Sequence, residues 1–239
     1  MATIGNVSPS SSSKPLITEI GTEKTPLVQI DNFLDDTFPL LDALKKGPGF
    51  HKPKSLFPGF HAPMAIPHVQ TIARHLLPML TDLYDIPANS EPRVGLSFYG
   101  LTTLQTHELA PVLSLPHYDF YDDQIFVGLI YLNEGPYEGT GFYQHTSTGY
   151  ERISAENHEE YGAIAASIEE NLKDAEPTYN VQDDHYGEIG RVDYKPNRMA
   201  IYPANLLHAP LISKPELLTR DENKGRLTAN IEIRFVNPN

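Results

Sequence analysis

From Arg93 onward, apolar residues alternate with polar ones in short runs that are separated by glycine, proline, asparagine and aspartate. Alternation of this kind is typical of β-strands, whose side chains point to opposite faces with a period of two residues. Several short strands joined by turns predict an antiparallel barrel or jelly roll. The runs are Val94–Tyr99, Leu113–His117, Ile125–Leu132, Gly141–His145, Met199–Tyr202, Leu206–Ile212 and Leu227–Val236.

The part of the chain before these runs has helical periodicity instead. Residues 68–84 carry apolar side chains at three- and four-residue spacing, which predicts a helix packed against the sheet. A shorter helix is expected over about residues 35–46, where an aspartate precedes the helix and Gly-Pro ends it. Between the two, Lys54–Pro67 is rich in proline, glycine and aromatic residues. This composition predicts an ordered loop, which we expect to wall a binding site.

Two segments differ from the rest of the pattern. Residues 1–14 include four consecutive serines and offer little apolar surface to bury, which predicts a disordered tail. Residues 155–197 begin with apolar positions at helical spacing and continue as a polar stretch, which predicts a helical insertion in the β fold. We expect residues 15–239 to form one domain, mainly β with flanking helices, because their number suits a single core.

Composition excludes several classes of function. The chain has no cysteine, so disulfides, thiolate zinc sites and iron–sulfur clusters are excluded. Its 18 basic and 31 acidic residues give a net charge of −13, which disfavours binding to nucleic acid or to an anionic membrane. No run of about 20 apolar residues and no signal-peptide pattern is present, so we expect a cytoplasmic protein. A small-molecule substrate and a monomer or homodimer are the corresponding expectations for its partners.

One short motif suggests a metal site. In the sequence His117-Tyr118-Asp119, the first and third side chains lie on one face if the segment is extended. In a chain with 10 histidines such a pair also arises by chance as an ordinary hydrogen-bonded pair. His208, in an apolar stretch, is the candidate for a third ligand, although a core histidine is more often structural. Two histidines and one carboxylate are typical of non-haem iron(II) oxygenases, and zinc is the competing metal.

A series of further motifs accompanies the three candidate ligands. In chain order the series is Tyr99-Gly100, His117-Tyr118-Asp119, Tyr131-Leu132-Asn133, Glu138-Gly139-Thr140-Gly141-Phe142, His208-Ala209-Pro210 and Gly225-Arg226-Leu227-Thr228. With this series the chain resembles the iron(II)- and 2-oxoglutarate-dependent dioxygenases, in their prolyl-hydroxylase-like branch, over about residues 93–236. Two features depart from that branch: 18 positions separate His208 from Arg226, and residues 155–197 lengthen the chain between Asp119 and His208.

The resemblance implies a double-stranded β-helix, which is a cupin-like jelly roll. It also implies that His117, Asp119 and His208 bind iron(II). Arg226 would then pair with the distal carboxylate of 2-oxoglutarate, and a planar guanidinium suits this task because it donates two parallel hydrogen bonds. The other co-substrate contacts that the resemblance implies come from the hydroxyl groups of Tyr131, Thr228 and Tyr99.

The activity implied by the resemblance is hydroxylation of an unactivated C–H bond with dioxygen as oxidant. An amino acid or a peptide-like metabolite is the substrate that we expect. Two alternatives remain open at the level of the sequence. One is a cupin-type zinc or manganese enzyme, an isomerase or hydrolase that does not use 2-oxoglutarate, and the other is a non-catalytic jelly-roll binding module.

Overall fold

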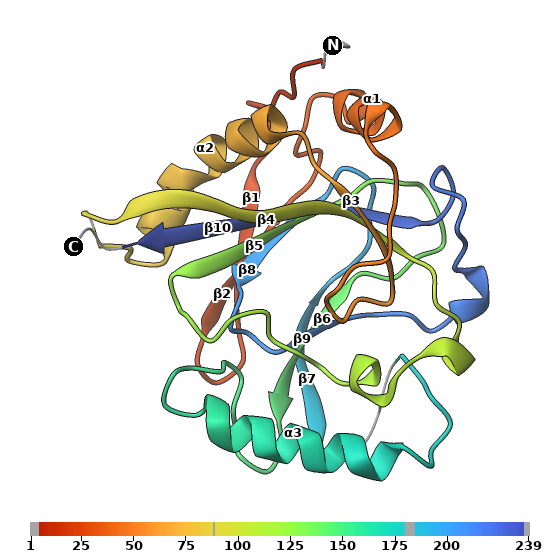
Figure 1. The fold of residues 1–239 in the computed structure, drawn as a ribbon. Helices are drawn as coiled ribbons and strands as arrows, with labels where there is room; N and C mark the ends of the chain where they lie inside the picture. The colour runs from red at the N-terminus through yellow and green to blue at the C-terminus, as the bar shows by residue number, and fades with distance from the viewer. Residues whose placement is uncertain (1–4, 88, 180–184, 237–239) are drawn as a thin grey trace.

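The computed structural model describes residues 5–87, 89–179 and 185–236, and its strands form two antiparallel sheets (Figure 1). Among these residues the larger sheet has seven strands, in the spatial order β1 (Pro15–Ile20), β2 (Thr25–Ile30), β8 (Met199–Pro203), β5 (Ile125–Tyr131), β10 (Arg226–Val236), β4 (Glu91–Thr102) and β3 (Gly59–Pro63). The smaller sheet contains, in the same described part, β7 (Tyr186–Val192), β6 (Thr140–His145) and β9 (His208–Pro210).

From β4 onward the chain passes back and forth between the two sheets. Strands β4, β5, β8 and β10 join the larger sheet, and β6, β7 and β9 join the smaller one. The segment at His117 adds a fourth position to the smaller sheet, because it forms an antiparallel bridge with His208 in β9. This order is that of a double-stranded β-helix, so the predicted fold class is confirmed.

The strand expected at Leu113–His117 is reduced to that single bridge. Residues Pro111–Ser114 instead form a short 3₁₀ turn, η2. Proline lacks the N–H group that a strand ladder needs. Pro116 lies within the expected strand, and Pro111 lies two residues before it. Two further 3₁₀ turns are η1 (Thr106–Glu108) and η3 (Pro215–Leu217).

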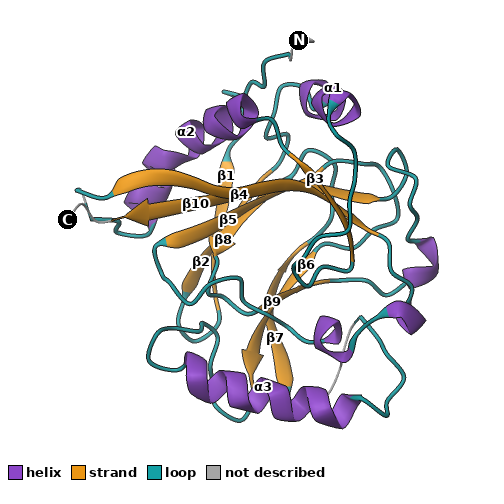
Figure 2. Cartoon of the chain, viewed as in Figure 1, coloured by secondary structure: helices purple, strands orange, loops and turns teal. Residues whose placement is uncertain are grey.

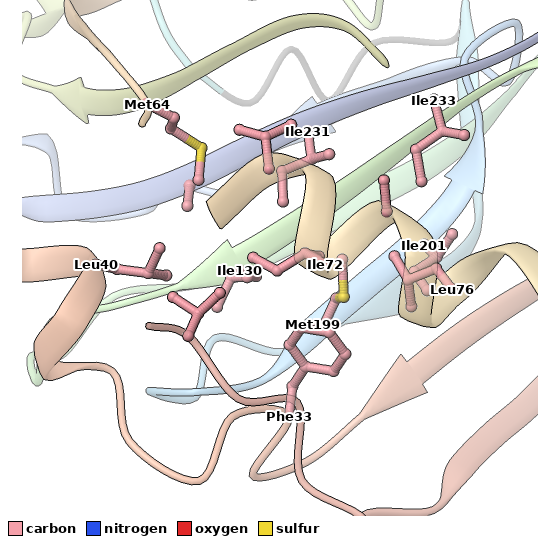
Figure 3. Close-up of a cluster of buried hydrophobic side chains, with 14 of the residues drawn as sticks. Phe33, Leu40, Met64, Ile72, Leu76, Ile130, Met199, Ile201, Ile231 and Ile233 are labelled. Carbon is pink, nitrogen blue, oxygen red and sulfur yellow. The ribbon is translucent and has the colours of Figure 1, made fainter. Parts of the chain in front are cut away.

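Helices α1 (Phe38–Lys46) and α2 (Ile66–Leu83) cover the outer face of the larger sheet, close to where the apolar periodicity predicted them (Figures 1 and 2). The apolar face of α2 packs onto the strands: Ile72 and Leu76 lie near Ile201, Ile231 and Ile233 (Figure 3). Each of these side chains is at most 1% exposed. The main hydrophobic core therefore lies between the helices and the larger sheet, outside the space between the two sheets.

The two faces of strand β10 lie in different environments, the main core and the cavities between the sheets. Leu227, Ala229, Ile231 and Ile233 belong to the main core, whereas the alternate residues Arg226, Thr228, Asn230 and Glu232 are polar and line the cavities between the sheets. Because successive side chains of a strand point to opposite faces, one face stabilises the fold while the other is available for chemistry.

The predicted disordered tail is wrong for the residues of it that the structure describes. Residues 5–14 run along the loop after β2, where Ser10 N–H donates to the Phe33 carbonyl (2.8 Å) and Pro9 bridges Leu34. Val7 is only 5% exposed and joins the main core, so the segment has an apolar anchor that its serine-rich composition obscured. Residues 1–4 of the prediction lie outside the described residues.

The predicted helical insertion is too long. Its first part is a helix, α3 (His158–Leu172), which packs on the outer side of the smaller sheet through Tyr161 and Ile168 (Figure 1). Its last part contains β7, which pairs with β6 and is an integral strand of the smaller sheet. The alternation in β7 is weak because five of its seven residues are exposed or only partly buried, and two of these five are glycines. Residues 180–184 lie outside the described residues, and no helix in the described part is long and apolar enough to cross a bilayer.

Ion pairs connect the residue after β2 with the loop that precedes β8. The Asp31 carboxylate accepts hydrogen bonds from Arg198 Nε (2.6 Å) and from Lys195 Nζ (2.9 Å). The hydrogen bond from Arg198 lowers the pKa of Asp31 from 3.8 to about 2. A carboxyl group whose pKa is lower in the folded state stabilises the fold above its unfolded pKa, and this stabilisation is lost as the pH falls through the folded pKa.

We therefore expect Asp31→Asn to lower the melting temperature at pH 7 by a few degrees, since partly exposed ion pairs contribute about 1 kcal/mol at most. The difference from the wild type should shrink as the pH is lowered from 4 to about 2, because Asp31 then also becomes protonated in the folded state. Thermal unfolding followed by circular dichroism measures both values. A difference that stays constant over this range would contradict the assignment.

Candidate metal and anion site

His117, Asp119 and His208 converge between the two sheets. One potential ligand atom from each lies within 4.8 Å of the other two, and no other such group of three occurs among the described residues. Asp119 lies 4.0 Å from His117 Nε2 through one oxygen and 3.8 Å from His208 Nε2 through the other. The structure thus brings together the three side chains that the sequence singled out, although 91 positions separate His208 from His117 in the chain.

Backbone hydrogen bonds fix the positions of these residues. His117 N–H donates to the His208 carbonyl (2.9 Å), His208 N–H donates to the His117 carbonyl (2.8 Å), and Asp119 N–H donates to the Ala204 carbonyl (2.9 Å). The site is therefore held by the pairing of the short segment at 117–119 with β9 and the turn before it. A site supported by main-chain pairing is rigid enough to hold a ligand set in place.

The tautomer of His208 and the pKa of His117 both favour binding of a cation. His208 Nδ1 lies 2.9 Å from the Leu206 carbonyl, which only accepts hydrogen bonds, so Nδ1 carries the proton and the Nε2 lone pair faces Asp119. Enclosure between the sheets and the neighbouring His208 ring lower the pKa of His117 to about 4, against the opposing effect of Asp119. At neutral pH a metal ion would therefore meet an uncharged His117 imidazole, together with His208 Nε2 and the Asp119 carboxyl oxygens.

Two cavities, each of about 290 Å³, meet at this cluster. Both are bordered by His117, Asp119, His208 and Tyr202. We call one the arginine cavity, because Arg226 lines it together with Thr102, Thr140, Thr228 and Pro210. We call the other the aromatic cavity, because Phe98 and Phe120 line it together with Leu96, Val127 and Ile231.

Arg226 is a buried cation without a counter-charge. It is 4% exposed, and no carboxylate of the described residues lies within 4.0 Å of its guanidinium nitrogens. Its three nitrogens donate to the carbonyls of Gly139 (Nη2, 2.8 Å) and Glu138 (Nε, 3.3 Å) and, at 3.5 Å, to the Thr102 hydroxyl (Nη1). This leaves one N–H on each terminal nitrogen, which is the pair of donors that a carboxylate accepts. Burying an unpaired charge is costly, so the arrangement favours an anionic ligand.

Thr228 and Tyr131 are register partners on neighbouring strands near this cation. Thr228 lines the arginine cavity. The Tyr131 hydroxyl instead hydrogen-bonds the Thr140 hydroxyl (2.9 Å) and lies behind it. Burial raises the pKa of Tyr131, and the Arg226 charge opposes that shift. Thr228 is thus placed to contact a ligand directly, while Tyr131 reaches the cavity wall by way of Thr140.

Tyr99 is a correction to the predicted site. Its hydroxyl donates to the Leu40 carbonyl of α1 (2.8 Å), and its side chain is fully buried in the main core. The neighbouring residues on β4, Phe98 and Thr102, face the cavities instead. Tyr99 therefore lies on the opposite face of the strand from the ligand site, because a one-residue step along a strand reverses the direction of the side chain.

Tyr202 is a site residue that the sequence did not single out. It lies on β8, borders both cavities, and its ring is 4.9 Å from the ring of His208. Its hydroxyl forms no hydrogen bond with a described residue, so it is available to a bound molecule. Burial, followed by the nearby Asp119 carboxylate, raises the pKa of Tyr202 well above 10. Alternation with the core residue Ile201 placed Tyr202 on the other face, but the sequence did not indicate that this face borders a cavity.

The expected wall at Lys54–Pro67 is present in a modified form. Its first part supplies Leu56, Phe57 and Pro58 to the cavities, while its second part forms β3 and the start of α2. By contrast, no described residue of the 155–197 segment lines either cavity, so its described part is not a substrate wall. His145 also lies away from the cavities, behind the smaller sheet, where Nδ1 contacts the Thr148 hydroxyl at 2.8 Å.

Fold and site together define a double-stranded β-helix protein with a cluster of two histidines and one carboxylate beside a buried arginine. Residues 12–233 match the model of a family of unknown function (DUF6445), and because this match spans most of the chain, the chain belongs to that family. A comparison with curated proteins found no match.

Solved structures that match this chain include those of HygX and SnoN. HygX from Streptomyces hygroscopicus with nickel, 2-oxoglutarate and hygromycin B bound is 12% identical, with 89% of this chain and 84% of that chain covered and a TM-score of 0.45. An iron-bound structure of HygX is 13% identical, with 89% and 83% covered and a TM-score of 0.46. SnoN, a non-haem α-ketoglutarate-dependent epimerase from nogalamycin biosynthesis, is 11% identical, with 89% and 79% covered and a TM-score of 0.45. Similarity of this degree does not transfer an activity, so the function has to be inferred from the side chains of this chain.

The corrected position of Tyr99 leads to a prediction. Tyr99→Phe removes one buried hydrogen bond to Leu40, which should cost about 1 kcal/mol and lower the melting temperature by about 2–4 °C. Any affinity for 2-oxoglutarate, the co-substrate that the sequence resemblance implies, should be the same in this variant as in the wild type, because the hydroxyl faces α1. Calorimetric titration of the folded variant measures that affinity, and Tyr202→Phe, which alters a cavity hydroxyl, is the comparison. A weaker affinity in Tyr99→Phe would contradict the placement.

Proposed function

We propose that this protein is an iron(II)- and 2-oxoglutarate-dependent oxygenase that hydroxylates an unactivated C–H bond of a small molecule. The observation that carries the proposal is the unpaired Arg226 guanidinium in a cavity that opens onto the two-histidine, one-carboxylate cluster. A metal-binding cluster by itself is compatible with many enzymes. The buried Arg226 cation in the same cavity favours a co-substrate that is a metal chelator at one end and a carboxylate at the other.

The residues fit the metal and the co-substrate. His117, Asp119 and His208 would bind iron on one side and leave its other side open to the two cavities, as a facial arrangement requires. Arg226 would hold the distal carboxylate of 2-oxoglutarate, with Thr228 beside it and with the hydroxyl groups of Thr102 and Thr140 on the same wall. Tyr202 has a free hydroxyl at the junction of the cavities and is placed to contact either bound molecule.

When bound, iron(II) with 2-oxoglutarate supplies the activation of dioxygen that breaks a strong C–H bond. The protein's part is to orient and to exclude water. The guanidinium and threonine hydroxyls fix the diacid, the backbone pairing of His117 with His208 fixes the ligand set, and the apolar walls keep water from the reacting carbon. Because Asp119 occupies the carboxylate position, the ligand set favours hydroxylation over halogenation.

A cupin-type zinc or manganese enzyme is the second candidate. The same three side chains would bind either metal. A zinc or manganese enzyme of this kind would supply no anion to pair with the buried Arg226. A non-catalytic jelly roll would supply a ligand neither for Arg226 nor for the metal-binding cluster. The oxygenase proposal gives each of these groups a ligand, and we prefer it on that ground.

Metal binding is tested with the charge-transfer absorption of the ternary complex. Anaerobic protein with iron(II) and 2-oxoglutarate should develop a weak visible metal-to-ligand band. The band should be lost in His117→Ala and Asp119→Ala, whose side chains are partly exposed in the cavities, so that removing them should leave the fold intact. His107→Ala, which changes an exposed histidine away from the site, is the control and should keep the band. A well-folded, iron-loaded wild type without the band would exclude 2-oxoglutarate chelation and favour the zinc or manganese enzyme.

The anion site is tested separately. Arg226→Gln should weaken 2-oxoglutarate about 10- to 100-fold, because a hydrogen bond to a charged group contributes about 1.5–3 kcal/mol. Iron(II) affinity without 2-oxoglutarate should stay within a few-fold of the wild type. Arg220→Gln is the matched control, since Arg220 lies over the Phe60 ring and does not line the arginine cavity. Titration of the visible band gives the affinities, and an equal loss in both variants would refute the assigned role of Arg226.

A further inference from the structure

The aromatic cavity differs from the arginine cavity in the chemistry of its walls. Apart from the metal cluster, most of the side chains around it are apolar or aromatic: Leu56, Phe57, Leu96, Phe98, Phe120, Val127 and Tyr202. Apart from the metal cluster, its polar residues are Ser55, His61, Asn230 and Glu232. Cavities of this composition bind ligands mainly through apolar contact, with a few polar groups that set the orientation.

The one carboxylate in this wall beyond the metal cluster is already neutralised. Glu232 is 6% exposed, accepts a hydrogen bond from the Leu96 backbone N–H (3.2 Å) and pairs with Arg234 Nε. The Arg234 guanidinium in turn lies over the Phe120 ring, 4.5 Å from its centre. A cationic substrate would have to displace this internal partner. Glu232 is therefore a poor anchor for an ammonium group.

The histidine in this wall is uncharged at neutral pH. Burial, with a smaller contribution from His51, lowers the pKa of His61 to about 4. His61 Nε2 is buried and has no hydrogen-bond partner among the described residues. Apart from the metal cluster, the described residues of the aromatic cavity thus offer no unpaired charge, in contrast to the unpaired cation of the arginine cavity. An amino acid, which carries both charges, would find no partner for either of them here.

Three rings in this wall are already packed against one another. The His61 ring stacks on Phe98 with 3.7 Å between centres, and Phe57 meets His61 edge-on at 4.4 Å. They come from β3, β4 and the preceding loop, so the surface is preformed before any ligand arrives. Preformed aromatic faces favour offset or edge-on contact with another ring.

The size and the opening of the cavity are consistent with a ring system. A dry cavity of roughly 150 Å³ accommodates benzene, so a cavity of about 290 Å³ has room for two fused rings. Leu56 and Leu96, both in its wall, are 70% and 64% exposed. Large apolar side chains with this exposure next to a cavity favour a ligand that continues outward and covers them.

We propose that the aromatic cavity binds an uncharged aromatic ring system of the substrate and presents one of its C–H bonds, or that of a substituent, to the metal cluster. This inference rests on the proposed function only for the statement that the metal cluster is the reaction centre. It assigns the anion to one cavity and the neutral substrate to the other, and it replaces the amino acid that we expected from the sequence.

Three naphthalene derivatives whose substituents are neutral, negative and positive at pH 7 test the proposal: 2-naphthol, 2-naphthoate and 2-naphthylmethylammonium. At pH 7, 2-naphthol should bind at least tenfold more tightly than either charged compound, as measured by anaerobic calorimetric titration with iron(II) and 2-oxoglutarate present, so that the metal would neutralise Asp119 and the diacid would occupy the arginine cavity. When 2-naphthol is added to the anaerobic complex with iron(II) and 2-oxoglutarate, it should shift the visible band, because the aromatic cavity opens onto the metal ligands.

Leu96→Glu is the informative variant, since it places a carboxylate in the wall at an exposed position and should weaken 2-naphthol at least tenfold. Leu16→Glu is the matched control: Leu16 is 58% exposed on β1 and lines neither cavity. Equal binding of the three compounds would overturn the proposal, and so would equal effects of the two variants. Either result would leave the oxygenase assignment standing if the visible band forms. Selective 2-naphthol binding without any visible band would support the neutral cavity and overturn the oxygenase assignment.

Discussion

The opposite orientation of neighbouring side chains on the larger sheet is the constraint on which the rest of the structure depends. On β10, one set of alternate residues packs against α2 and closes the main core, and the other set faces the smaller sheet. The stabilising contacts and the chemical groups are therefore carried by the same strands without competing for the same space. A polar group such as Arg226 can be buried next to the cavities because the apolar burial that stabilises the strand occurs on its other side.

In the smaller sheet, a single bridge between His117 and His208 positions two of the candidate metal ligands. Two reciprocal hydrogen bonds between His117 and His208 bring the two imidazoles together across the only bridge between their segments. The Leu206 carbonyl then selects the tautomer of His208 that leaves Nε2 facing Asp119. Backbone groups thus determine the positions of the two histidines and the direction of the His208 Nε2 lone pair.

Charge is divided between the two cavities that meet at this cluster. One contains a buried guanidinium that has no counter-ion among the described residues, and the other contains a carboxylate that is paired with Arg234 and a histidine held neutral by burial. In a space of low dielectric such differences decide which ligand enters which cavity, since an unpaired charge costs several kcal/mol while a paired one costs much less. A reaction that needs an anionic co-substrate and a neutral substrate side by side would be served by this division.

Sequence by itself determined the residues whose identity defines their chemistry: the H-x-D pair, the third histidine and the arginine at the start of a strand. It also indicated the β fold and the two N-terminal helices, because a period of two or of three to four residues is a local property. Tertiary structure decided which face of each strand meets the cavities. It moved Tyr99 to the outer core, brought Tyr202 and Thr102 to the site and made β7 part of the smaller sheet. The physical reason is that alternation separates two faces but does not indicate which of them is packed against helices, and only the contacts between segments distant in the chain settle that.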